Sequence, residues 1–498
     1  MLYLAALLLT VWFWRRNFKD STVWMLATYV GVGLLFWRDY SMASAMEESV
    51  FPLIIKDFIV IGLVGLVQSM AVAKRISILT AVILIFSLFA ASYLIKLPDF
   101  GEEAQTEVSA SPYDQNGEFL VEITPGEGQN FNRVARQNGW RVLPAFVPLN
   151  HLLTDLDDYV VVDVKNTATA TKILEGLSSV DYFEPNEVIT VEPFIEGEVG
   201  AKKANPALGI NDPNTDQQWA MEALQMDAYY RLLAKQTPKK KARIAILDTG
   251  IDSKHEDIRA NFFSIDKKYD NDPQGHGTHC AGIAAGVTNN GIGIGSLAGT
   301  GNQPFVEVTA VKVLNSAGMG TQKSIIAGII EAVDEGADVL SLSLGGPSNQ
   351  SRQRAYSQAV KYAHDHGAIV IAAAGNSNRD AANYSPANAT GIIAVAAIDQ
   401  FLLRAPFSNK VNNIPYGIAA PGVGIFSTVP GSKYATYSGT SMACPFVAGL
   451  LGTMRAVNPD LNAKQAYQIL KATGKDGAET ALTGRIVQPA AALEAALK

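Results

Sequence analysis

Three short segments carry residue types that can together perform nucleophilic chemistry. Asp248 lies in Ile-Leu-Asp-Thr-Gly, His276 in Gly-His-Gly-Thr-His, and Ser441 in Gly-Thr-Ser-Met-Ala. A serine hydroxyl is a weak nucleophile at neutral pH. It needs a histidine to take its proton and an aspartate to keep the imidazole in the useful tautomer. The three segments therefore predict an Asp-His-Ser triad.

The elements around these residues are those of an α/β fold. Asp248 follows a predicted strand at 243–247, where the carboxyl end of a parallel strand faces a ligand crevice. Ser441 opens a predicted helix, which places its hydroxyl beside free backbone N–H groups and the positive end of the helix dipole. Further strands are predicted at 306–313, 339–344, 368–374 and 392–397, and helices at 276–286 and 321–335. This alternation predicts a parallel sheet with helices on both faces.

The three segments resemble the signature motifs of the subtilisin-like serine proteases (the subtilase, or peptidase S8, family). The resemblance extends from about Asn211 to the C-terminus. It implies a subtilisin-like catalytic domain at 211–498 that hydrolyses peptide bonds in polypeptide substrates through an acyl-enzyme intermediate. The order Asp, His, Ser is also the one known for subtilisin, and it differs from the orders of two unrelated folds.

The resemblance also implies roles for residues outside the triad. Ala372-Ala-Ala-Gly-Asn-Ser resembles the oxyanion-hole segment, with Asn376 as a donor beside the N–H of Ser441. An asparagine after glycine can also be a simple turn residue. An edge strand with flanking glycines can pair with an extended peptide. The implied substrate-binding positions are Ser341, Leu342, Ser343, Leu344, Gly345, Gly346, Ala373 and Gly375.

The loop Thr288-Asn-Asn-Gly-Ile-Gly-Ile resembles the principal calcium loop of the family. Hard oxygen ligands of this kind suit Ca²⁺. The alternative is a glycine-rich surface loop without an ion. The implied structural calcium ligands are Thr288, Asn290, Ile292 and Ile294 in the loop, with Asp212 and Asp257 as remote carboxylates.

Residues 115–192 form a separate predicted module before the catalytic domain. Its predicted elements are strands at 119–124, 141–147, 159–164 and 188–192, and helices at 130–138 and 170–177. The order β-α-β-β-α-β matches the ferredoxin-like α+β motif. The module occupies the place of the family's inhibitory propeptide (inhibitor I9-like), which implies a zymogen that processes itself. Residues 193–210 are rich in Gly, Pro and Asn and are predicted to be an exposed processing linker.

The first hundred residues contain four apolar runs, at 1–14, 22–37, 50–73 and 76–95. About 20 residues of helix cross a bilayer core, so 1–97 is predicted to be a membrane anchor with three or four transmembrane helices. A polar linker at 98–114 follows. The basic residues cluster in the loops at 15–19 and 74–75. The positive-inside rule therefore places the catalytic domain on the extracytoplasmic side of a plasma or inner membrane, with release after processing left open.

The net charge, the cysteines and a second histidine limit the other functions and sites that the chain can have. A formal net charge of −7 without a basic stripe argues against nucleic-acid binding. Cys280 and Cys444 are either two buried thiols or one bridge between adjacent helices. His279 lies three residues after His276, but no carboxylate or cysteine spacing completes a zinc set. The resemblance to the subtilases implies that His279 is structural.

Overall fold

A computed structural model describes residues 117–150, 154–191, 194–197, 205–300, 303–348 and 353–498. The predicted membrane anchor at 1–97 and the polar linker at 98–114 lie outside these residues. We call residues 117–191 the α+β region and residues 205–498 the α/β region. Both belong to one compact unit, Ser109–Lys498. No helix in the described ranges has both the length and the apolar character needed to cross a bilayer.

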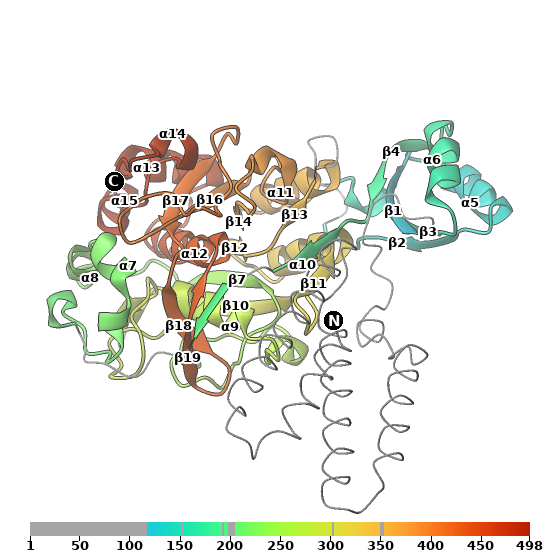
Figure 1. The fold of residues 1–498 in the computed structure, drawn as a ribbon. Helices are drawn as coiled ribbons and strands as arrows, with labels where there is room; N and C mark the ends of the chain where they lie inside the picture. Colours follow the sequence, from blue (N-terminus) through green and yellow to red (C-terminus); the bar gives the residue numbers. More distant parts are fainter. Residues whose placement is uncertain (1–116, 151–153, 192–193, 198–204, 301–302, 349–352) are drawn as a thin grey trace, which may run out of the picture. The chain divides into compact units, whose positions relative to one another are not determined.

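The α/β region is built on a parallel sheet of six strands, in the order β10-β7-β12-β14-β16-β17 (Figure 1). The strands are β7 (Ala242–Asp248), β10 (Val306–Lys312), β12 (Val339–Leu342), β14 (Ile369–Ala373), β16 (Ile393–Ile398) and β17 (Gly417–Pro421). Every residue of β12, β14, β16 and β17 is buried, as expected for strands covered on both faces. The predicted parallel sheet is confirmed.

Four helices cover this sheet. Helices α9 (His276–Ala285) and α12 (Thr440–Val457) pack together on one face, and α10 (Gln322–Asp334) and α11 (Arg354–Asp365) pack together on the other (Figure 1). Crossovers between parallel strands are right-handed, so the covering helices change face where the strand order reverses. This reversal lies between β7 and β12, and Asp248 is the last residue of β7. Ligands bind at such a switch point, beyond the carboxyl ends of the strands.

Smaller elements complete the α/β region. The helices are α7 (Trp219–Ala223), α8 (Met226–Leu233), α13 (Ala463–Thr473), α14 (Thr480–Thr483) and α15 (Pro489–Ala496). The minor strands are β8 (Gly299–Thr300), β9 (Gln303–Pro304), β11 (Met319–Thr321), β13 (Gly346–Pro347), β15 (Tyr384–Ser385), β18 (Ile425–Val429) and β19 (Lys433–Ser438). Antiparallel β18 and β19 lead the chain directly into α12 and Ser441.

The α+β region has an antiparallel sheet in the order β2-β3-β1-β4. Its elements are β1 (Gly117–Ile123), α5 (Gly128–Gln137), β2 (Arg141–Pro144), β3 (Tyr159–Val164), α6 (Thr167–Glu175) and β4 (Val180–Pro185). The predicted order β-α-β-β-α-β is therefore observed. Side chains alternate across the sheet: Phe119 and Val121 pack in the small core of this region, whereas Leu120 joins the core of the α/β region.

Two predicted boundaries are wrong. The closing strand was expected at 188–192, but β4 closes the sheet, and β5 (Val188–Thr190) pairs with β11 of the α/β region. The stretch 193–210 was expected to be an exposed linker, yet it contains β6 (Phe194–Gly197), which pairs with β19. Apolar alternation indicates a strand but does not say which sheet the strand joins.

Candidate active site

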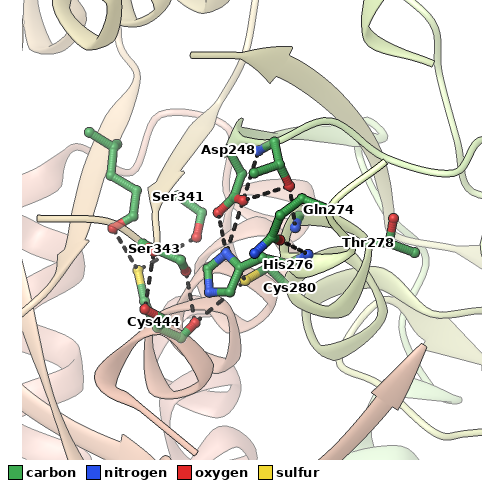
Figure 2. A network of polar contacts seen from close by, with 12 residues as sticks. Asp248, Gln274, His276, Thr278, Cys280, Ser341, Ser343 and Cys444 are labelled. Carbon is green, nitrogen blue, oxygen red and sulfur yellow. Dashed lines mark hydrogen bonds and ion pairs between the residues drawn. The ribbon is translucent and has the colours of Figure 1, made fainter. Parts of the chain in front are cut away.

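Asp248 and His276 form a buried pair at the carboxyl end of β7. The His276 Nδ1 lies 2.9 Å from both carboxylate oxygens of Asp248 (Figure 2). The backbone N–H of Thr249 donates to Asp248 Oδ1 at 2.8 Å and helps to fix the carboxylate. A ring nitrogen that donates to a carboxylate leaves Nε2 as the basic atom of a neutral imidazole.

Two glycines bring His276 to this position. Gly275, directly before α9, has φ +102°, which side chains rarely adopt. At Gly277 a Cβ would overlap the carbonyl oxygen of Gly250, so only glycine lets α9 approach the end of β7. Burial disfavours the charged imidazolium, but the Asp248 carboxylate outweighs it and raises the pKa of His276 well above its usual value.

Ser441 is the second residue of α12 and is almost fully buried. Its hydroxyl donates to the carbonyl of Ser343 at 3.1 Å, and the Ser343 hydroxyl donates to the carbonyl of Ser441 at 2.8 Å. Within the described residues, Nε2 of His276 has no hydrogen-bond partner. The serine therefore faces Ser343, and a hydrogen bond to His276 requires rotation of the Ser441 hydroxyl.

The two cysteines flank this arrangement as free, buried thiols, so the bridge that spacing left open is not formed (Figure 2). Cys280 Sγ lies 3.6 Å from the Ser441 carbonyl and 4.0 Å from His276 Nδ1, and it therefore joins the two residues. Cys444 Sγ lies 3.5 Å from Ser341 Oγ. Burial raises the pKa of both thiols, to about 12 for Cys444, and keeps them neutral. The i,i+4 spacing of His276 and Cys280 on a helix is the signal for this contact.

Asn376 lies beside the N-terminus of α12. Its Oδ1 accepts from the backbone N–H of Thr440 at 2.8 Å and from the Thr440 hydroxyl at 2.9 Å. These bonds orient the amide. A Cβ at Gly439 would lie 3.4 Å from Asn376 Nδ2 and 3.6 Å from the backbone nitrogen of Ser441. The two nitrogens therefore border one small space that glycine keeps open.

The predicted substrate-binding segment divides into two parts. Ser341 and Leu342 are fully buried in β12, which is a central strand because it pairs with both β7 and β14. The expected edge strand is therefore wrong for these two residues. The chain leaves the sheet at Ser343, and Gly345 pairs with Thr190. Leu344 is buried, Gly346 begins β13, Ala373 ends β14, and Gly375 has φ +100° beside the ring of Tyr384.

The predicted calcium residues come together near the start of the α/β region. Asp212 accepts backbone N–H groups of Asn289 and Asn290 at 2.6 and 2.9 Å. Asp257 accepts the Asn290 side-chain amide at 2.9 Å and the Ile294 N–H at 2.8 Å. Both carboxylates are fully buried, and burial raises their pKa, to about 6 for Asp212 and about 8 for Asp257. Two buried carboxylates around a loop are a hard-oxygen donor set that fits Ca²⁺.

His279 occupies a structural position. It is fully buried, its ring stacks on Tyr437 at 4.2 Å between centroids, and its Nε2 lies 3.1 Å from the Ala435 carbonyl. Burial lowers the pKa of His279 to about 3, so the ring stays neutral. The ring connects α9 to β19, the strand that leads to Ser441.

Comparisons with known proteins converge on one family. Residues 239–487 match the model of the subtilase family. Thermitase from Thermoactinomyces vulgaris is 47% identical over 218 residues, which cover 43% of this chain and 74% of thermitase. Subtilisin DY from Bacillus licheniformis is 40% identical over 238 residues, which cover 46% of this chain and 82% of that protein.

Two further matches extend over more of the chain. An alkaline protease from Shouchella clausii is 36% identical over 312 residues, 61% of this chain and 78% of that protein. This length exceeds residues 211–498 and includes part of the preceding sequence. A solved structure of proteases from Pseudoalteromonas arctica PAMC 21717 matches with a TM-score of 0.52 and 30% identity, over 58% of this chain and 99% of that one.

Proposed function

The chain belongs to the subtilase family and is a serine-type endopeptidase, and from this premise we propose that Asp248, His276 and Ser441 are its catalytic triad. The observation that carries the proposal is the buried Asp248–His276 pair at 2.9 Å, with Ser441 joined to His276 through contacts with Cys280. Asp248 keeps the proton on Nδ1, which leaves Nε2 to act as the general base.

In the proposed mechanism the Ser441 hydroxyl turns from the Ser343 carbonyl toward His276 Nε2. His276 takes the hydroxyl proton as Ser441 Oγ attacks the scissile carbonyl, and it then gives this proton to the leaving amine. In the second half of the reaction His276 takes a proton from water as the water oxygen attacks the acyl carbonyl. His276 then returns this proton to Ser441 Oγ as the carboxylic acid product leaves. Asp248 stabilises the imidazolium that forms in both steps.

Asn376 Nδ2 and the backbone N–H of Ser441 are the proposed donors to the oxyanion of the tetrahedral intermediate. Both nitrogens border the space beside Gly439. Preorganised donors of this kind stabilise charge that develops only in the transition state, so they raise kcat more than they lower KM. The Thr440 bonds to Asn376 Oδ1 supply the preorganisation.

The α+β region is the proposed inhibitory propeptide of a zymogen. Its residues Val188–Thr190 pair with β11, and Thr190 pairs with Gly345, one of the predicted substrate-binding positions. The match to the Shouchella clausii protease, which extends before residue 211, supports this proposal. Polypeptide substrates are proposed to pair with the same backbone groups that Val188–Thr190 occupies, and such pairing favours extended chains over any one sequence.

Residues 1–97 are the proposed membrane anchor, with three or four transmembrane helices and the α/β region on the extracytoplasmic side of a plasma or inner membrane. The apolar runs and the basic loops of the sequence support this proposal. Protease added to intact spheroplasts is expected to cut the stretch 198–204. Protection of that stretch, with cutting in the 15–19 loop, would reverse the orientation.

A structural Ca²⁺ ion is proposed at the loop 288–294, with Asp212 and Asp257 as its carboxylate ligands. The donor set fits, because the two carboxylates are buried without a cation among the ion pairs of the described residues. A bound cation supplies the missing positive charge, so its role is to stabilise the folded state. The ion takes no part in catalysis.

Replacement of Ser441 tests the enzymatic assignment against an inactive, triad-bearing scaffold. Ser441→Ala is expected to lose peptide hydrolysis by roughly a millionfold, the size known for this change in subtilisin. A fluorophosphonate probe is expected to label the wild type and a Ser264→Ala control, whose serine is exposed and bonds to Asp270 outside the triad. Labelling or hydrolysis that survives in Ser441→Ala would disprove the assignment.

A further inference from the structure

The α+β region supplies hydrogen-bond acceptors to the first turns of two helices of the α/β region. The backbone N–H of Gln322, the first residue of α10, donates to the Glu187 carbonyl at 2.8 Å. The backbone N–H of Lys323 donates to the Asn186 side chain at 2.9 Å. The first N–H groups of a helix have no partner within it, so the start of α10 depends on these acceptors.

Glu184 of β4 has the same role at α11 and is almost fully buried. Its Oε1 accepts from the backbone N–H of Ala355 at 3.3 Å and from the Gln322 side-chain amide at 2.9 Å. Its Oε2 accepts from the Tyr182 hydroxyl at 3.0 Å. Gln353, the N-cap residue of α11, makes no capping bond with its side chain. A carboxyl group from the α+β region therefore caps this helix.

The charge of Glu184 is not balanced by a cation. Glu122, another buried carboxylate of the α+β region, pairs with Arg354 at 2.9 Å. Glu184, by contrast, is in no ion pair within the described residues. Burial, together with the nearby negative charge of Glu187, outweighs the three neutral donors and raises the pKa of Glu184 to about 7.

Three phenols also surround Glu184, and none of them can supply a positive charge. Tyr182 lies on β4, Tyr159 on β3 and Tyr356 on α11. Burial raises the pKa of Tyr159 and Tyr356 well above the usual range, and the Glu184 carboxylate adds to this effect. The phenols therefore stay neutral. A proton is the species that can remove the charge of Glu184 without any movement of the neighbouring side chains.

The hydrogen bonds of Glu184 fit a protonated acid. Both N–H donors, from Gln322 and Ala355, bond to Oε1, which remains an acceptor in a carboxylic acid. The partner of Oε2 is the Tyr182 hydroxyl, which can reverse its role and accept from an Oε2–H group. A proton on Oε2 therefore keeps all three hydrogen bonds and removes the unbalanced charge.

We propose that the α+β region takes up one proton on Glu184 when it seats on α10 and α11, so that rising pH loosens this contact. The proposal rests on the proposed function only in its consequence, which is that release of the inhibitor is favoured as the surroundings change from acidic to neutral. Away from the α/β region, Glu184 lies in water and has its ordinary pKa of 4.5. A pKa that is raised in the seated state stabilises the contact fully below the ordinary value, and this contribution is lost as pH rises through the raised one.

Hydrogen exchange in the full-length Ser441→Ala chain tests the proposal, because this variant is not expected to process itself. The backbone N–H groups of Gln322, Lys323 and Ala355 donate to the α+β region, so their protection reports whether it is seated. After correction for the intrinsic pH dependence of exchange, this protection is expected to fall by up to about tenfold per pH unit between pH 5 and pH 7 and to level off above. Amides of β16, which is buried at every position, are the internal reference and should show no such fall.

Two further variants of the Ser441→Ala chain assign the proton. Glu184→Gln has no charge and keeps an acceptor for both N–H groups, so at pH 8 it is expected to retain the protection seen at pH 5. Glu122→Gln is the matched control: it loses the bond to Arg354, so protection is expected to be lower at every pH, with an unchanged slope. A flat profile with Glu184 in place, or a slope that survives in Glu184→Gln, would overturn the proposal. Peptide hydrolysis by the wild type while the α+β region is still seated would instead refute the proposed inhibitor and leave the proton uptake intact.

Discussion

The α/β region and the α+β region bury their apolar side chains in different ways. In the α/β region, strands such as β12 and β14 are buried at every position, and helices of the same region cover both faces of the sheet. In the α+β region the strands alternate. Phe119 and Val121 face its own helices, whereas Leu120 and Val161 face the core of the α/β region.

The two regions therefore differ in whether they can bury their apolar side chains without the other. The α/β region has a complete core, while the α+β region on its own leaves one apolar face of its sheet exposed to water. Polar groups surround the shared face: Glu122 accepts from Arg354 at 2.9 Å, and Glu184 accepts from Gln322 at 2.9 Å. A buried carboxylate that loses its partner is costly. The proposed function, in which the α+β region is a removable inhibitor, requires such a difference between the two regions.

Among the changes that leave Ser441 in place, Asp248→Asn is expected to have the largest effect, and it acts only on the α/β region. The carboxylate raises the pKa of His276, and catalysis needs the neutral imidazole, so activity of the wild type falls as pH decreases through that raised pKa. The neutral amide removes this effect, so the acid limb of kcat/KM is expected to move to lower pH. The maximal rate is expected to fall about 10⁴-fold, because the histidine tautomer is no longer fixed.

A pH series of kcat/KM with a peptide substrate measures both effects. Asp266→Asn, at an exposed aspartate paired with Lys268, is the control and should leave the profile unchanged. An acid limb that stays at the wild-type position in Asp248→Asn would contradict the role of the Asp248 charge.

Asn376→Ala is expected to have the second-largest effect. Loss of one oxyanion donor lowers kcat by roughly 10²–10³-fold, as known for the equivalent donor in subtilisin, with little change in KM. Steady-state kinetics on a short peptide amide measures both constants. Asn383→Ala, an exposed asparagine, is the control. A rise in KM at constant kcat would assign Asn376 to substrate binding instead.

Sequence patterns predicted the elements of the α/β region well, because a strand buried on both faces is a continuous apolar run. The motifs also predicted where Asp248, His276 and Asn376 lie. They could not predict that the Ser441 hydroxyl donates to Ser343, since that depends on a rotamer and not on residue type. Nor could they show that Cys280 contacts both His276 and Ser441.

The junction between the regions was the least predictable part. Residues 188–190 have the alternation of a strand, and 180–185 include two acidic residues and a proline, so the wrong segment was expected to close the α+β sheet. Both segments are strands. The difference lies in their partners, since β5 pairs with β11 at 319–321, far away in sequence. Long-range pairing is a property of the whole fold, not of a local pattern.

The effect of calcium is expected to be smaller than that of Asn376→Ala and larger than that of the last change below. Calcium is expected to raise the stability of the α/β region. An ion at 100 to 1,000 times its Kd adds about 3–4 kcal/mol to the free energy of unfolding, or roughly 6–16 °C in Tm for a domain of this size. Asn290→Ala combined with Asp257→Ala is expected to abolish the difference in Tm between calcium and chelator. Asp216→Ala, an exposed carboxylate nearby, should keep it. A wild-type Tm that chelator leaves unchanged would exclude the calcium site.

Arg354→Ala is expected to have the smallest effect, and only on the contact between the two regions. Arg354 lies at the start of α11 and donates to Glu122, which is buried in the α+β region and also accepts from Gln358 and from the Tyr159 hydroxyl. Arg354 is half-exposed, so solvent screens the pair and the other two donors remain. We therefore expect about a tenfold faster release of the α+β region after processing of the proposed zymogen.

Recovery of peptide hydrolysis after processing measures the release, because under the proposed function the site is free only once the α+β region has left. Lys361→Ala is the matched control, since Lys361 lies on the same helix in an exposed pair with Asp365. The fully recovered kcat should be the same in wild type, Arg354→Ala and the control, because Arg354 contacts Glu122 of the α+β region and not the triad. An unchanged recovery rate would mean that the apolar face of the sheet alone determines how fast the α+β region is released. A lowered final kcat would mean that Arg354 also stabilises the α/β region itself.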